Sequence, residues 1–110
     1  MKQLKLGFDK SGLILDEVDK QKSPEELSVA IIKNVIFAYG QHQKGISEEE
    51  RLKFYKISDA FDKDIKDKSE EVELEDDWIG FVKKCFREAP LLPSPLLRVV
   101  EENLRAIQNR

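Results

Sequence analysis

The sequence is poor in the residues that most often carry catalytic or metal-binding chemistry. Its 110 residues include a single cysteine, Cys85, and a single histidine, His42. One cysteine excludes an internal disulfide and is typical of a reducing compartment. One histidine leaves a zinc site short of ligands and leaves a nucleophile with one possible base. We expect Cys85 to be a buried structural thiol and His42 to be an exposed residue of the polar turn at 40–45.

Long apolar runs and glycine-rich loops are also missing. The most apolar stretch, residues 27–39, is interrupted by Ser28, Lys33 and Asn34 and is too short to span a bilayer. The N-terminal segment has no apolar run of the kind found in a signal peptide. The five glycines are scattered, so no phosphate-binding loop is present. We expect a cytoplasmic protein, or a virion-associated one if it is phage-encoded, with no membrane contact and no cofactor.

Excess charge of one sign is missing as well. Charged residues make up 37% of the chain, but 19 basic and 22 acidic residues leave a net charge of only −3. This balance favours neither nucleic-acid binding nor mimicry of a polyanion. Lys83, Lys84 and Arg87 form a small basic patch, but Glu88 adjoins it and no exposed aromatic residue is interleaved. We interpret the patch as a solvated helix face and expect no nucleic-acid partner.

The acidic stretch at 62–73 has some features of a calcium-binding loop. Counted from its first residue, it has Asp64 at position three and Glu73 at position twelve. However, Lys66 takes the fifth position, and Asp67 takes the sixth, where the loop needs a glycine. Three lysines among the would-be ligands would also repel a cation. We therefore predict no metal site.

Strong helix signals are what the sequence does contain. Ser23, Pro24 and Glu26 form a capping box with proline at the first helical position, and the helix is predicted to run to about Tyr39. Apolar residues occupy almost its full circumference, which predicts burial on several sides at the centre of the fold.

Three further helices are predicted by similar signals. Ser47 and the glutamates after it begin one, whose apolar side chains recur at helical spacing. Asp76 and Asp77 favour the start of another through the helix dipole, and Pro90 ends it. Ser94 caps the last helix.

The N-terminal segment is predicted to contribute a sheet. Residues 4–8 alternate in polarity, residues 9–12 carry a turn signal, and residues 12–15 resume an apolar run, which together indicate a β-hairpin. Residues 72–74 also alternate and predict a short third strand. The expected fold class is α+β, with an N-terminal hairpin packed against about four helices in a single compact domain over residues 1–110.

The segment Ala-Pro-Leu-Leu-Pro-Ser-Pro-Leu-Leu at 89–97 is predicted to be a folded corner between the last two helices. Pro90 and Pro93 turn the chain away from the helix axis. Its four leucines, which we expect to be buried near the apolar face of the preceding helix, are Leu91, Leu92, Leu96 and Leu97. The alternative is a displayed proline-rich ligand peptide.

Two motifs suggest a wider relationship. Ser-Glu-Glu-Glu-Arg-Leu-Lys-x-Tyr lies within residues 45–55, and Val-Glu-Leu-x-Asp-Asp-Trp occupies residues 72–78, ahead of a proline break and a final Val-Val-Glu-Glu-x-Leu helix. In this order they resemble a set of small, mostly uncharacterised proteins encoded in phage and prophage genomes. The resemblance implies an α+β domain in phage morphogenesis or phage–host interaction, and it implies no catalytic residue.

The functional prediction is a non-enzymatic protein-interaction or structural module, of phage origin if the resemblance holds. The central helix carries more apolar surface than the other elements are expected to cover, so we predict self-association or a protein partner. The expected contact residues are Ile32, Ile36 and Phe37. A small regulator acting on a nucleic-acid-associated partner and an enzyme of unrecognised type remain as alternatives. A basic groove would favour the regulator, and a pocket of convergent carboxylates would favour the enzyme.

Overall fold

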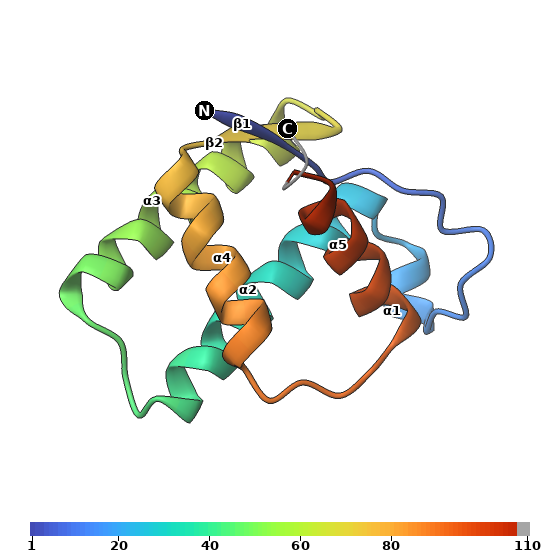
Figure 1. Ribbon diagram of the computed structural model, residues 1–110. Coiled ribbons are helices and arrows are strands. Elements are labelled where there is room, and N and C mark those ends of the chain that lie inside the picture. Colours follow the sequence, from blue (N-terminus) through green and yellow to red (C-terminus); the bar gives the residue numbers. More distant parts are fainter. Residues whose placement is uncertain (108–110) are drawn as a thin grey trace.

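The computed structural model describes residues 1–107, which form a two-stranded antiparallel sheet and five helices (Figure 1). In chain order the elements are β1 (Lys2–Lys5), α1 (Glu17–Lys20), α2 (Pro24–His42), α3 (Glu48–Lys66), β2 (Glu71–Leu74), α4 (Asp76–Glu88) and α5 (Pro95–Ala106). The predicted α+β class is confirmed. The short helix α1 lies in a segment for which no structure was predicted.

The four predicted helices are present, and three of them begin at the predicted serine caps. The Ser23 side chain accepts a hydrogen bond from the Glu26 amide while the Glu26 carboxylate accepts one from the Ser23 amide, so the capping box of α2 is complete. The Ser47 side chain accepts a hydrogen bond from the Glu50 amide at the start of α3, and the Ser94 side chain accepts one from the Leu97 amide at the start of α5. Each cap satisfies an amide that the helix leaves unpaired, worth about 1 kcal/mol.

The predicted N-terminal hairpin is wrong. Strand β1 pairs with β2, with Leu4 opposite Val72 and Lys5 opposite Glu71, whereas residues 9–15 form no strand. The physical reason is the pattern of side chains. Strand β2 alternates exposed and buried residues in step with β1, whereas residues 13–15 are apolar on both faces, so a strand there would pair less well with the alternation of β1. The possible third strand at 72–74 is therefore the second strand of the sheet.

Helix α2 lies at the centre of the fold, as predicted. It contacts α3, α4 and α5, with α3 and α5 on opposite sides of it in Figure 1. The sheet lies across one end of the helices, with β2 against α3 and β1 against α5. The buried residues of α2 are Leu27, Ser28, Val29, Ile32, Val35, Ile36 and Tyr39. The buried Ser28 hydroxyl donates a hydrogen bond of 2.6 Å to the Leu6 carbonyl, which ties the segment after β1 to α2.

The corner at 89–97 is folded only in part as predicted. Leu91 packs against the core from a half-buried position and Leu97 is buried, but Leu92 is 89% exposed. The segment between α4 and α5 is neither helix nor strand. Successive side chains of an extended segment point to opposite sides, and Pro93 favours an extended Leu92. Only one of the two adjacent leucines can therefore face the core.

We expect Leu97→Ala to lower the free energy of unfolding by about 2–4 kcal/mol, because it opens a cavity under α5. The matched variant Leu92→Ala should change it by less than about 0.5 kcal/mol, because that side chain is already in water. Urea unfolding followed by Trp78 fluorescence measures both values. Equal losses for the two variants would show that Leu92 is packed in solution.

Candidate functional site

The structure divides the three predicted contact residues between core and surface. Ile32 and Ile36 are 1% and 2% exposed and belong to the hydrophobic core, so neither is available on the surface. Phe37 is 55% exposed. A residue one position further along a helix points about 100° away, so Phe37 leaves the face that Ile32 and Ile36 share. Of the three predicted contact residues, Phe37 is the one that is accessible on the surface.

An apolar groove of about 530 Å³ lies beside Phe37, between the C-terminal half of α2 and the N-terminal half of α3. Its aromatic lining consists of Phe37, Phe54 and Tyr55. The Phe37 and Phe54 ring centroids are 5.3 Å apart at an interplanar angle of 54°, and those of Phe54 and Tyr55 are 6.0 Å apart. Tyr55 is also 55% exposed. These tilted contacts hold the rings against one another while leaving two of them open to solvent.

The turn between α2 and α3 closes one end of the groove. Lys44 and Gly45 have positive φ angles of 58° and 118°, and the Gly45 amide donates to the Gly40 carbonyl at 2.8 Å. This left-handed turn reverses the chain at the end of α2. Arg51 then donates from Nη1 to the Ile46 carbonyl at 2.8 Å, which joins α3 to the turn. This end of the groove is thus fixed by one hydrogen bond between backbone groups and one from the Arg51 side chain to the backbone.

The charge lining the groove is positive. Lys44 and Arg51 are the charged residues of its lining, and across residues 1–107 neither takes part in an ion pair. By contrast, Lys33, one turn before Phe37 on α2, pairs with Asp62 of α3 at 3.1 Å. The groove therefore presents aromatic surface with two cations that are held in no ion pair among the described residues.

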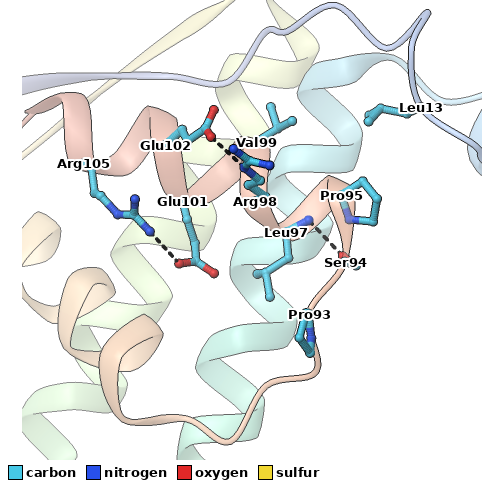
Figure 2. Close-up of a pocket in the computed structure, with 10 residues that line it drawn as sticks. All are labelled: Leu13, Pro93, Ser94, Pro95, Leu97, Arg98, Val99, Glu101, Glu102 and Arg105. Carbon is cyan, nitrogen blue, oxygen red and sulfur yellow. Dashed lines mark hydrogen bonds and ion pairs between the residues drawn. The ribbon is translucent and has the colours of Figure 1, made fainter.

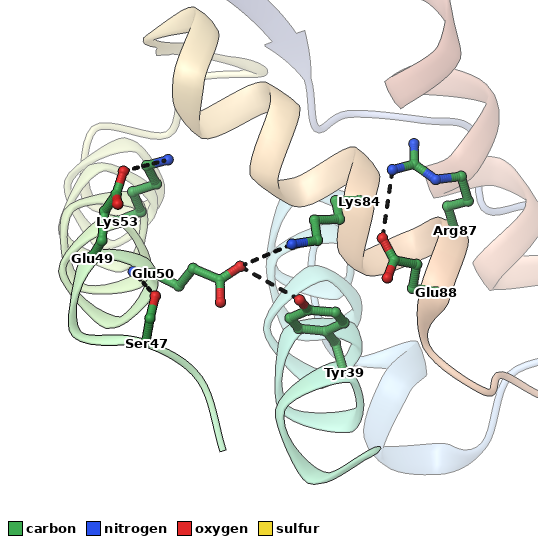
Figure 3. Close-up of polar contacts among 8 residues, drawn as sticks. All are labelled: Tyr39, Ser47, Glu49, Glu50, Lys53, Lys84, Arg87 and Glu88. Atoms are coloured by element: carbon green, nitrogen blue, oxygen red, sulfur yellow. Dashed lines mark hydrogen bonds and ion pairs between the residues drawn. The ribbon is translucent and has the colours of Figure 1, made fainter. Parts of the chain in front are cut away.

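A polar cluster on another side of α2 fixes the helices that form the groove (Figure 3). The Tyr39 hydroxyl donates to Oε2 of Glu50 at 3.5 Å, and Nζ of Lys84 donates to the same oxygen at 3.4 Å. Nζ of Lys84 also lies 5.6 Å from the centroid of the Tyr39 ring. Hydrogen bonding to Tyr39 and attraction to Glu50 raise the pKa of Lys84. The cluster joins α2, α3 and α4 at one point.

The reactive residues are placed where structural roles explain them. Cys85 is fully buried, and burial raises the pKa of its thiol to about 12, so it is protonated and a poor nucleophile. His42 is exposed at the end of α2. In the predicted basic patch Arg87 pairs with Glu88 at 3.6 Å, as Figure 3 shows.

The acidic stretch at 62–73 does not form a loop, because α3 continues to Lys66 and β2 begins at Glu71. Within residues 1–107, no three His, Cys, Asp or Glu side chains come together in a way that could hold a metal ion. One carboxylate in the stretch is nevertheless unusual. Oδ2 of Asp64 is buried without a hydrogen-bond partner, and burial, followed by repulsion from Asp67 and Glu25, raises the pKa of Asp64.

A larger groove of about 770 Å³ runs along α5, beside Leu13 and Pro93 (Figure 2). Its charges are paired within α5: Arg98 with Glu102 at 3.0 Å and Arg105 with Glu101 at 3.3 Å. Both pairs join residues four positions apart on the helix, where side chains are neighbours. Because its charges compensate one another, this groove has little electrostatic preference, and we take the α2–α3 groove as the candidate site.

Sequence reasoning missed the part of the site that α3 contributes. The predicted apolar face of α3 holds Phe54, Ile57, Phe61 and Ile65. Leu52 and Tyr55 lie outside it and are exposed. Tyr55, a large aromatic side chain off the buried face of an otherwise amphipathic helix, was the signal that could have indicated this surface, whereas Leu52 lies outside the groove lining.

No protein family, curated protein or solved structure matches this chain at a significant level. Among the described helices, none has the length and apolar character that crossing a membrane requires. The site is therefore interpreted from its own geometry.

The burial of Cys85 predicts slow modification. At pH 8 we expect an aromatic disulfide reagent to react with the native protein only as fast as the protein unfolds, because the pKa of about 12 leaves almost no thiolate and the core excludes the reagent. The unfolded protein in concentrated guanidinium chloride, as the control, should react at once. Rapid reaction of the native protein would contradict the burial.

The buried carboxylate predicts a pH-dependent gain in stability for Asp64→Asn. Burial raises the folded-state pKa above the ordinary 3.8, so the contribution of this group to stability is full below that pH and is lost as pH rises through the folded pKa. At pH 7 the amide should raise the free energy of unfolding by less than about 1 kcal/mol after solvent screening, and the gain should vanish near pH 3.

Thermal unfolding at both pH values measures the gain. The control is Asp59→Asn, an exposed position on the same helix, which should change stability by less than about 0.5 kcal/mol. A loss of stability for Asp64→Asn at pH 7 would mean that this carboxylate has a partner in solution.

Proposed function

We propose that the protein is a non-enzymatic protein-interaction or assembly module, and that the α2–α3 groove is its contact site. The observation that carries this proposal is the pair of half-exposed aromatic rings, Phe37 and Tyr55, in a preformed apolar groove. Exposed aromatic and arginine side chains gathered in one place are typical of the energetic centres of protein interfaces. Arg51 at the rim completes this combination.

The positions of the reactive groups support a non-enzymatic role. Cys85 is held as a buried thiol, and Glu50 is occupied by Tyr39 and Lys84. A general acid or base needs an accessible group with a tuned pKa that faces a substrate pocket. The groove offers aromatic rings and two basic side chains instead.

The phage resemblance supports a role in phage morphogenesis or phage–host interaction. Residues 45–55, which carry much of the resemblance, form the turn and the α3 wall of the groove. The partner would then be a virion component or a host protein.

Site-specific photo-crosslinking tests the contact site. With a benzoylphenylalanine at position 37, in cells that naturally make the protein, we expect a discrete cross-linked protein adduct, because a partner would cover this side chain. The same group at position 14, where Ile14 is fully exposed and outside the groove lining, should give no such adduct. Absence of a protein adduct at position 37, or identical adducts at both positions, would refute the proposal.

A further inference from the structure

We infer that the α2–α3 groove binds an acidic amphipathic peptide segment of its partner, with bulky apolar side chains on one face and Asp or Glu beside them. This inference rests on the proposed function and specifies the chemistry of the partner.

The size of the groove favours a single segment. About 530 Å³ accommodates a few bulky side chains, within the range of ordinary ligand pockets. The groove is bounded by two helices and by the Ile46 turn, and its apolar lining matches the apolar anchors of an amphipathic helix. Phe37 and Tyr55 are open at its mouth and would pack against those anchors.

The two cations at the rim of the groove favour a bound segment with negative charge. Arg51 uses one Nη atom for the Ile46 carbonyl, which orients the guanidinium and leaves further N–H donors for a carboxylate. Lys44 is exposed on the adjacent turn. The nearby Lys33–Asp62 pair adds no net charge. Carboxylates beside the apolar anchors would therefore gain charge-assisted hydrogen bonds at the rim.

Other occupants fit less well. A stable dimer involves roughly 20–30 residues on each partner, more than the ten residues that line this groove. Two lining cations, Lys44 and Arg51, are also fewer than the roughly 6–10 phosphate contacts of a typical DNA-binding protein.

The test is selection from a displayed library of random peptides against the full-length protein. Enriched sequences should carry Asp or Glu beside large apolar residues spaced by three or four positions. The strongest peptide, made synthetically, should bind with a Kd in the micromolar range by fluorescence anisotropy. Its affinity should fall as salt is raised, since the attraction is between partly exposed charges.

Variants locate the binding. Phe37→Ala and Lys44→Glu should each weaken this peptide about tenfold or more, the size of a hot-spot contact or a reversed charge. Arg51→Gln, which keeps a donor for the Ile46 carbonyl, should weaken it several-fold. The matched controls, Lys56→Glu and Lys63→Glu, lie on α3 outside the groove lining and should leave the affinity within about twofold. An unchanged melting temperature establishes that each variant is folded.

Three results would overturn the inference: selection of basic or uncharged peptides, binding that does not depend on Phe37, or a dimer in sedimentation that Phe37→Ala dissolves. The third identifies a second copy as the occupant. A protein adduct at position 37 together with basic peptides would retain the proposed function and reject the acidic partner. Absence of both the adduct and any Phe37-dependent peptide would reject both.

Discussion

Burial of helix α2 is the constraint on which the rest of the structure depends. Its 19 residues are apolar around most of the circumference, and each large side chain that becomes fully buried contributes roughly 1.5–3 kcal/mol. Helices α3, α4 and α5 each cover part of it. The sheet closes one end, where the Ser28 hydroxyl satisfies the buried Leu6 carbonyl and so lets the chain after β1 pack directly on α2.

The other helices cover α2 unequally, and the candidate site lies on the side of α2 that remains partly exposed. On one side of α2, Tyr39 hydrogen-bonds to Glu50 of α3, and Lys84 of α4 hydrogen-bonds to the same carboxylate. Polar contacts from α3 and α4 therefore cover that side of α2. On another side Phe37 meets Phe54 but stays half-exposed. The hydrogen bond between Tyr39 and Glu50 also fixes α3 against α2. The groove is therefore held open before any ligand arrives, which lowers the entropic cost of binding.

The helices could be predicted because their signals are local, whereas strand pairing and exposure depend on distant residues. Ser23 and Ser94 cap helices with groups three residues away. Leu4 pairs with Val72, so no nearby residue could indicate its partner, and the turn signal at 9–12 suggested a false one. On a helix apolar nearly all round, the sequence could not say which side α3 would leave open. Phe37 was therefore identified together with two residues, Ile32 and Ile36, that are buried.

Net charge was a poor guide to partners for a related reason. The total of −3 indicated no preference, but the surface is a mosaic in which many charges are cancelled by a neighbour, as in the Arg98–Glu102 pair. An approaching peptide segment interacts with the charges that remain unpaired at the place where it binds. At the α2–α3 groove the charged lining residues without an ion pair within residues 1–107 are Lys44 and Arg51, because the nearby Lys33 forms an ion pair with Asp62. Screening confines each charge to about 8 Å at physiological salt, so the charges that line the groove weigh more on what it binds than the total charge of the chain does. An acidic chain can in this way carry a site for acidic ligands.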